Sequence, residues 1–332
     1  MEHTIDELRM LQSLPLDLKV AMSLTRIRGW FQEYGEDGVY VAFSGGKDST
    51  VLLDLVRNQC GYRNALAMFV DVPTQYPELK AFVKTFDNVD IEKPKISFVE
   101  VCKRFGFPLI SKEVAECVHW AKRNDPTSGK GKWAVDKLNG AGKAADSPYG
   151  MRKYRFLLDA PFDTSADCCR TMKKAPSHNY AKRTGRKAMT AQMADESRLR
   201  TKNWLQYGCN FYDGKFPVSN PMAFWTENDV LEYIYKNKLR ICPVYGEVVP
   251  KDGLLTLDID GVQQYETTGC KRTGCMLCGF GCHLEKSPTR FEMLKQTHPG
   301  MLKLLDTCSN NGVTFREAIE WCNEHGGLNI KL

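Results

Sequence analysis

The hexapeptide Ser44-Gly-Gly-Lys-Asp-Ser49 has the composition of a phosphate-binding turn. Its two glycines allow positive φ and a close approach of the backbone to an anion, Lys47 adds a positive charge, and the serines add hydroxyl donors. The apolar run 39–43 predicts a strand before the turn, and residues 51–56 predict a helix after it. Backbone N–H groups and the positive end of the helix dipole would then face a phosphate. The alternative is a strand–turn–helix whose glycines only relieve crowding.

Six of the 13 cysteines are grouped as metal ligands would be: Cys168, Cys169, Cys270, Cys275, Cys278 and Cys282. The C-x-x-C spacing of Cys275 and Cys278 suits zinc and iron–sulfur clusters equally, and Cys270 with Cys282 would complete a local zinc set. Adjacent cysteines rarely bind one tetrahedral zinc ion because their side chains diverge, whereas a four-iron cube has separate corners. The tandem pair Cys168-Cys169 therefore favours an iron–sulfur cluster, with structural zinc and a redox-active dithiol as alternatives. The scattered cysteines are expected to be small buried residues.

Length and composition are those of an ordinary globular protein of about two domains, with 332 residues, 42% hydrophobic and 26% charged. No run of 18 apolar residues and no signal peptide is present, so we expect a soluble, cytoplasmic protein with no membrane partner. Cysteines in that compartment should be free or metal-bound. The net charge of +6 is mild for a nucleic-acid binder. The glycine- and lysine-rich segment 124–153 predicts a mobile basic insertion, either a solvated loop or a lid or nucleic-acid contact.

The elements that must position these residues alternate between helix and strand. Residues 16–34 predict a helix that ends at Gly35, and apolar segments at 65–72 and 95–101 predict a second and a third strand. This order predicts an α/β fold with a doubly wound, mainly parallel sheet. Four polar side chains then fall at the ligand-binding edge of the sheet: Asp71, Glu78, Arg198 and Arg200. Arginines there can bind phosphate oxygens through bidentate hydrogen bonds.

The rest of the chain predicts a helix capped at Thr226, an irregular or hairpin segment at 250–268, and a last helix capped at Thr314. We therefore divide the chain into three parts. Residues 1–37 form an N-terminal helical segment, 38–240 a nucleotide-binding α/β domain, and 241–332 a cysteine-rich, mostly helical C-terminal region.

The hexapeptide is not of the Walker type and resembles the pyrophosphate loop of the N-type ATP pyrophosphatases. In that superfamily the loop holds the β- and γ-phosphates while the α-phosphate is attacked. Over about residues 38–285 the chain resembles the phosphoadenosine phosphosulfate (PAPS) reductase family. The matching stretches are Ser44-Gly-Gly-Lys-Asp-Ser49, Asp71 with Tyr76-Pro-Glu78, Cys168-Cys-Arg-Thr-Met-Lys-Lys-Ala-Pro176, Asp195-Glu-Ser-Arg-Leu-Arg200, Asn220-Pro with Phe224-Trp-Thr-Glu-Asn-Asp-Val230, and Thr273-Gly-Cys-Met-Leu-Cys278.

The resemblance to cluster-bearing members of this family implies that Cys168, Cys169, Cys275 and Cys278 bind a [4Fe-4S] cluster. Cys270 or Cys282 could instead replace Cys168 or Cys169 as a ligand. Two departures matter. The reductases' C-terminal Glu-Cys-Gly-Leu-His tail is absent, since the chain ends after Cys322 in Asn-Glu-His-Gly-Gly-Leu-Asn-Ile-Lys-Leu. The pyrophosphate loop, typically degraded in the reductases, is intact, and the family's Gly-x-Arg is replaced by Ala191-Gln-Met193. Both main departures favour relatives that cleave ATP, such as DNA phosphorothioation sulfurtransferases and cluster-dependent tRNA thiolases.

The resemblance thus implies an ATP-dependent sulfurtransferase that adenylates its target. The residues expected to bind pyrophosphate with Mg²⁺ are Ser44, Gly45, Gly46, Lys47, Asp48 and Ser49. Asp71 would contact the metal or ribose, and Lys47, Asp48, Arg198 and Arg200 would act in catalysis. Expected partners are an adenine nucleotide, a nucleic acid (tRNA or DNA) or another acidic substrate, a sulfur-donor protein and a second copy in a homodimer. The alternatives are a thiol-dependent reductase of adenylyl sulfate or PAPS, with Cys322 as a displaced nucleophile, and a non-catalytic zinc- or nucleic-acid-binding protein.

Overall fold

A computed structural model describes residues 3–141, 151–214, 216–251 and 261–332 of the chain. These residues form two compact units, and each unit combines segments that are far apart in the sequence. Unit 1 consists of Met1–Asp71, Tyr76–Glu92 and Ser177–Thr273, and unit 2 of Val72–Gln75, Lys93–Pro176 and Gly274–Leu332. The three parts predicted from the sequence, 1–37, 38–240 and 241–332, are each continuous in the chain, and that division stays a prediction. Within the described ranges, no helix combines the length and apolarity needed to cross a bilayer.

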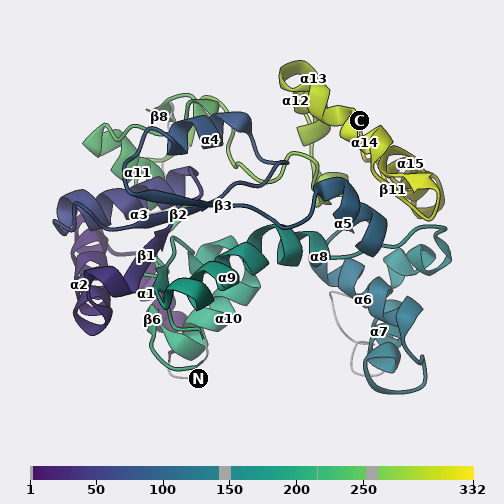
Figure 1. Cartoon of the computed structure of the whole chain (residues 1–332), viewed down its shortest axis with the longest axis horizontal. Coiled ribbons are helices and arrows are strands. Elements are labelled where there is room, and N and C mark those ends of the chain that lie inside the picture. The colour runs from purple at the N-terminus through teal and green to yellow at the C-terminus, as the bar shows by residue number, and fades with distance from the viewer. Residues whose placement is uncertain (1–2, 142–150, 215, 252–260) are drawn as a thin grey trace. The chain divides into compact units, whose positions relative to one another are not determined.

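Unit 1 contains a six-stranded sheet in the order β3-β2-β1-β5-β7-β6 (Figure 1). The strands are β1 (Val39–Ala42), β2 (Ala67–Val70), β3 (Val89–Glu92), β5 (Lys187–Met189), β6 (Asn210–Phe211) and β7 (Val218–Ser219). Every pairing is parallel except that of β6 with β7. The predicted α/β fold with a doubly wound, mainly parallel sheet is confirmed. The strand order reverses between β1 and β5, and ligands of such sheets bind at this switch point.

Helices cover the sheet on both faces because the strand residues alternate between two cores. Val41 of β1 packs in the larger core, whereas Tyr40 packs edge-on against Tyr180 with ring centroids 5.1 Å apart. The helices of unit 1 are α1 (Ile5–Gln12), α2 (Leu16–Tyr34), α3 (Lys47–Asp54), α4 (Pro77–Val83), α9 (Ala175–Thr184), α10 (Arg198–Tyr207) and α11 (Glu227–Asn237). In Figure 1, α3 and α9 lie on opposite sides of the strands.

The helix boundaries follow the capping signals in the sequence. As predicted, α2 ends at Gly35, which has φ of +71°. α11 begins after Thr226, and the Thr226 hydroxyl accepts the backbone N–H of Asp229 while the Asp229 carboxylate accepts the N–H of Thr226. β8 (Val248–Pro250) and β9 (Tyr265–Thr267) then pair antiparallel. This pairing agrees with the hairpin alternative predicted for 250–268. Residues 252–260 of that segment lie outside the described residues.

The predicted third strand at 95–101 is wrong. The segment instead begins helix α5 (Phe98–Phe105), because the Ser97 hydroxyl accepts the Glu100 N–H as an N-cap. Phe98, Val101 and Cys102 are buried at helical spacing. The third strand is β3, an edge strand whose residues are exposed or half-buried, so it lacks the continuous apolar run that marks a buried strand.

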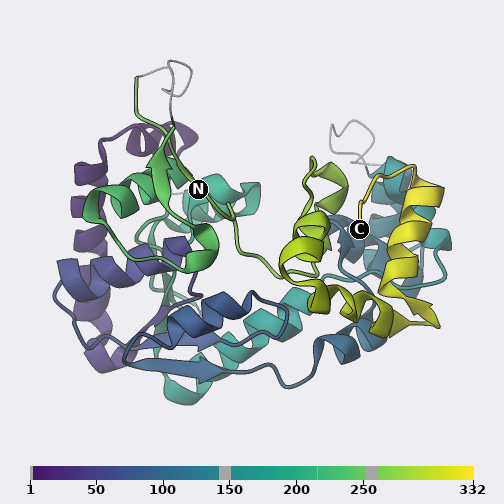
Figure 2. The same cartoon turned by 90° about the horizontal axis from the view of Figure 1, so that it is seen from above.

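Unit 2 is mostly helical, with two short two-stranded ladders, β4–β10 and β11–β12. Its elements are α5, β4 (Leu109–Ile110), α6 (Lys112–Arg123), α7 (Gly129–Asn139), η4 (Arg152–Asp159), α8 (Asp167–Cys169), β10 (Gly279–Phe280), α12 (Arg290–Thr297), α13 (Pro299–Leu302), α14 (Leu304–Thr307), β11 (Ser309–Asn310), β12 (Val313–Thr314) and α15 (Phe315–Gly326). Phe107 stacks on Phe315 with centroids 4.8 Å apart. The C-terminal helix α15, in yellow, lies beside η4 (Figure 2), where Trp321 stacks on Phe156.

The predicted mobile basic insertion at 124–153 is wrong for its first half. Residues 129–139 form α7, whose Ala134 and Leu138 are buried against the unit. Asp125 organises the turn before α7 by accepting hydrogen bonds from Thr127 and Ser128. The glycines and lysines suggested a loop, but the apolar residues on one face of the segment stabilise a helix by packing against the unit. Residues 142–150 of the insertion lie outside the described residues.

Candidate functional site

The phosphate loop (residues 44–49) connects the end of β1 to the start of α3. The Ser49 hydroxyl accepts the Ser44 N–H at 3.1 Å and donates to the Gly46 carbonyl at 2.9 Å. The Ser44 hydroxyl accepts the Gly46 N–H at 3.3 Å. Thr50 also donates its hydroxyl to the Gly46 carbonyl at 3.0 Å. These bonds hold the glycine turn at the N-terminus of α3, where the helix dipole favours an anion.

The two glycines of the loop are needed for different reasons. Gly45 has φ of +73°, and a Cβ there would lie 2.9 Å from Val83 Cγ2 and 3.1 Å from the Leu79 carbonyl oxygen. Gly46 has an ordinary φ of −73°. A Cβ on Gly46 would instead meet the Tyr245 hydroxyl at 3.2 Å. The loop backbone is therefore packed closely against α4 on one side and the tyrosine on the other.

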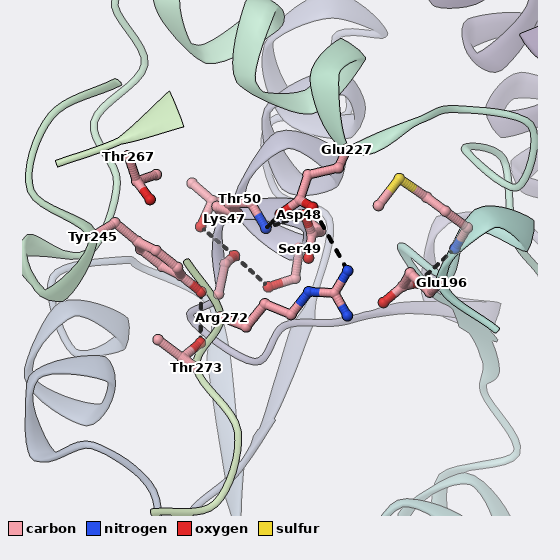
Figure 3. Close-up of polar contacts among 12 residues, drawn as sticks. Lys47, Asp48, Ser49, Thr50, Glu196, Glu227, Tyr245, Thr267, Arg272 and Thr273 are labelled. Atoms are coloured by element: carbon pink, nitrogen blue, oxygen red, sulfur yellow. Dashed lines mark hydrogen bonds and ion pairs between the residues drawn. The ribbon is translucent and has the colours of Figure 1, made fainter. Parts of the chain in front are cut away.

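Lys47 is the buried cation of the loop, with 4% of its surface exposed. Its Nζ lies 3.3 Å from Asp48 Oδ1 and 3.2 Å from Glu227 Oε1 (Figure 3). Burial by itself lowers the pKa of Lys47, but the two carboxylates outweigh burial, so the pKa is raised above its ordinary value. Lys47 thus stays charged. Asp48 Oδ1 is also buried, and it accepts no hydrogen bond from the residues that the structure describes.

Residues that follow α11 in the sequence lie close to the loop (Figure 3). The hydroxyls of Tyr245 and Thr273 lie 2.5 Å apart over Gly46. Arg272 Nη2 lies 3.6 Å from Glu227 Oε2. The sequence patterns predict a role at the phosphate loop for none of these side chains. The signals available are weak, because Glu227 stands out only as part of a helix cap and Thr273 only as part of the cysteine motif.

The four polar residues predicted at the sheet edge have different surroundings, and one of them, Glu78, lies in the first turn of α4. Burial lowers the pKa of Arg200, which lies close enough to Asp48 and Arg272 to feel both charges and which pairs with Glu196. Arg200 is therefore brought to the phosphate loop. Arg198 is exposed at the first position of α10. Asp71 follows β2 as predicted, and its Oδ2 lies 2.5 Å from Lys80 Nζ, an ion pair the sequence did not indicate.

A cavity of about 200 Å³ opens beside Lys47. Three lysines line it, Lys47, Lys251 and Lys271, together with the carboxylates of Glu227 and Glu266. Its position between the phosphate loop, α11 and β9 gives an anionic ligand access to the buried lysine.

In unit 2, the four predicted cluster ligands lie within electrostatic reach of one another. Cys168 and Cys169 end α8, which continues as a π-helical turn, η5 (Arg170–Lys174). Burial raises the pKa of Cys168, and the charges of Cys275, Cys169 and Cys278 raise it further. The raised pKa means that the Cys168 thiol stays protonated unless a nearby cation compensates its charge.

Lys173 supplies one such cation beside the cysteines. Burial lowers the pKa of Lys173, but Cys275 and Cys169 outweigh burial and the pKa is raised. Lys173 also donates a hydrogen bond to Cys275. Burial raises the pKa of Cys278, opposed by a hydrogen bond from the Phe280 N–H to its sulfur. The sulfurs therefore have both a charge partner and a backbone donor.

The other cysteines considered as ligands or nucleophiles are placed differently. Cys270 belongs to unit 1, where its sulfur lies 3.9 Å from the Tyr76 hydroxyl. Cys282 is buried and donates to the Cys278 carbonyl at 3.2 Å. Cys322 is fully buried in α15, and burial raises its pKa to about 12. Within the described residues, no group of three or more His, Cys, Asp or Glu side chains is arranged to hold a single metal ion.

Comparison with known protein families agrees with the motifs. Residues 38–123 and 133–279 match the family model of the phosphoadenosine phosphosulfate reductase domain. The chain belongs to this PAPS reductase family. The match covers the phosphate loop, the tandem cysteines and the C-x-x-C motif.

Two individual proteins are also similar to this chain. A 67-residue stretch is 34% identical to sulfate adenylyltransferase subunit 2 of Xylella fastidiosa, and it covers 19% of this chain and 22% of that protein. The chain thus matches only about a fifth of this curated relative's length. A solved structure with similarity to this chain is the crystal structure of phosphoadenylyl-sulfate (PAPS) reductase from Candida auris in a phosphate complex. The alignment covers 73% of this chain and 91% of the reductase chain, with 14% sequence identity and a TM-score of 0.38.

Proposed function

We propose that this PAPS reductase family member is an ATP-dependent sulfurtransferase that adenylates an oxygen of a nucleic acid and replaces that oxygen with sulfur. The observation that carries the proposal is the intact phosphate loop. Its hydroxyls, glycine backbone and buried Lys47 form a cradle for a pyrophosphate group. ATP carries such a group and sulfonucleotides do not.

The first proposed step is attack of an acceptor oxygen on the α-phosphorus of ATP. The bond from this phosphorus to the oxygen that bridges to the β-phosphate breaks, and pyrophosphate leaves with the electron pair. Loop N–H groups and the hydroxyls of Ser44 and Ser49 would bind the β- and γ-phosphates. Lys47 and Arg200 would stabilise the negative charge that grows on the leaving pyrophosphate.

Asp48 fits the role of a Mg²⁺ ligand in that step. Its buried Oδ1 accepts no hydrogen bond from the described residues. Mg²⁺ in nucleotide sites is held by one or two carboxylates together with phosphate oxygens. Glu227, which also pairs with Lys47, is the second carboxylate available.

In the second proposed step, sulfur at the oxidation level of sulfide attacks the adenylated atom. AMP leaves with the oxygen, so no oxidant or reductant is consumed. A [4Fe-4S] cluster, when bound, would hold and present this sulfur. Cys168, Cys169, Cys275 and Cys278 would hold the cluster, and this fits their mutual electrostatic reach and the hydrogen bond from Lys173.

Two measurements on anaerobically purified protein test the proposal. Iron and acid-labile sulfide should each be about four per chain, and Cys275→Ser should lose them while Cys60→Ser, at a scattered half-buried cysteine, keeps them. ATP with tRNA or DNA should give AMP and pyrophosphate, and Lys47→Met should abolish both while Lys236→Met does not. Absence of ATP binding and of AMP formation with every nucleic acid offered would refute the proposal.

A sulfonucleotide reductase is the second candidate, favoured by the family to which the chain belongs. Such a reaction needs an accessible thiolate to attack the sulfate sulfur. Cys322 does not meet this need, because it is buried and its pKa is raised to about 12. Sulfite release from adenylyl sulfate or PAPS with thioredoxin, lost in Cys322→Ser, would establish this reductase instead.

A further inference from the structure

A second cavity in unit 1, of about 250 Å³, lies between α10, the end of β5 and the β6–β7 pair. Trp204, Tyr207 and Phe211 form its aromatic wall. The rings of Tyr207 and Phe211 are tilted by 51° with centroids 4.5 Å apart. Pockets for drug-sized ligands span about 300–1,000 Å³, so this cavity suits a smaller group such as one fused ring system.

Three amides, Gln192, Asn203 and Asn220, are the main polar groups of the cavity. Among the described residues that line it, Arg200 is the one charged side chain. Arg200 is already paired with Glu196. The Thr190 hydroxyl donates to the Asn220 carbonyl oxygen, so the Asn220 NH₂ group is the part left to donate to a ligand. An uncharged planar ligand with hydrogen-bonding edges matches this lining better than an anion does.

The sequence at the end of β5 agrees with a neutral ligand. The segment Ala191-Gln-Met193 replaces the family's Gly-x-Arg, and two of its residues, Gln192 and Met193, line the cavity. The Met193 thioether thus stands at the position of the family's arginine, with the Gln192 amide beside it. Thioethers pack well against aromatic rings. The replacement therefore changes the site from one that attracts an anion to one that accepts a flat, neutral group.

We propose that this cavity binds a nucleobase, stacked on the aromatic wall and hydrogen-bonded by the amides. Arg200 links the cavity to the phosphate loop, because it lines the cavity and also feels the charge of Asp48. A base in the cavity would therefore place its sugar near the site where phosphates bind. The base comes either from the acceptor nucleic acid or from ATP itself. This inference deepens the proposed function. The binding of a base does not depend on that function, but the choice between ATP and the acceptor as its source does.

Binding of free nucleosides tests the inference without any phosphate chemistry. Adenosine, guanosine, cytidine and uridine are titrated separately and followed by saturation-transfer NMR and calorimetry. At least one should bind, and Tyr207→Ala should weaken that binding by about 5- to 100-fold through loss of stacking. Asn203→Ala should weaken it too. Both side chains are exposed, so folding should survive, and Tyr235→Ala, an exposed tyrosine on α11, is the matched control.

Competition then assigns the source of the base. If Mg-ATP displaces the nucleoside, the cavity takes the adenine of ATP; if both bind together, it takes a base of the acceptor. The inference is overturned if no nucleoside binds, or if Tyr207→Ala and Asn203→Ala bind the nucleoside as the control does. Pyrophosphate release is measured separately, so nucleoside binding without it would refute the proposed function alone.

Discussion

Replacement of Gly45 by alanine tests the close packing of the phosphate loop. Ala at φ of +73° adopts left-handed backbone, which costs about 1–2 kcal/mol. The lower entropy of the unfolded alanine chain offsets about 0.4–1 kcal/mol of this. The new Cβ would also lie 2.9 Å from Val83 Cγ2 and 3.1 Å from the Leu79 carbonyl, an overpacking of about 1–3 kcal/mol. We expect Gly45→Ala to lower the free energy of unfolding by about 2–4 kcal/mol.

Gly61 provides a matched control, because it has φ of +84° and no atom lies within 4 Å of the position that a Cβ would take there. Gly61→Ala should therefore show the backbone strain alone, about 1 kcal/mol. Urea unfolding followed by circular dichroism measures both variants, with equal m values as the check on comparability. ATP affinity, measured by calorimetry, should fall only in Gly45→Ala. Equal losses of stability in the two variants would show that the loop does not pack against α4.

Three further results are expected. Lys19→Met should lower the free energy of unfolding by about 3–5 kcal/mol in urea titration, because it leaves the buried Asp229, 2.7 Å away, without its cation. Lys236→Met, at an exposed lysine, should change the free energy of unfolding by less than about 0.5 kcal/mol. Cys322→Ala should change AMP formation less than about twofold, since burial raises the pKa of this thiol and keeps it protonated. A large loss of activity in this variant would instead support the reductase. EDTA should weaken ATP binding in calorimetry at least about tenfold, and Asp48→Asn should remove most of that metal dependence; equal affinity with and without Mg²⁺ would contradict a metal at Asp48.

The parts of the fold that sequence reasoning predicted well have local signals. The strand, glycine turn and helix of the phosphate loop are contiguous, so their order follows directly from residues 39–56. Gly35 ends α2, and Thr226 and Thr314 begin helices, because caps are satisfied by residues within one helical turn. The prediction of a third strand at 95–101 was wrong because a local signal was overlooked. The segment is apolar enough for a strand, but Ser97 caps a helix.

The closure of the phosphate loop could not be predicted in this way. Glu227, Tyr245 and Thr273 reach the loop from positions about 180 or more residues later in the chain. Only the sheet order brings them there, because β1 lies at the centre and the chain returns to it through β5. No local pattern marks a tyrosine hydroxyl as the neighbour of a glycine Cα. Spatial pairing of this kind becomes visible only in the folded unit.

The charge balance around Lys47 bears on which ligand can enter the site. Lys47 pairs with Asp48 and Glu227, and Arg272 pairs with Glu227, so the two carboxylates offset much of the positive charge at the loop. A buried lysine with its charge already balanced offers little net attraction to a bare triphosphate. A ligand that brings a divalent cation changes this, because the carboxylates can turn from the lysine to the metal and free the lysine for phosphate. If the proposed function is right, the carboxylates would do more than keep Lys47 charged: they would favour a metal-bound polyphosphate over a bare one.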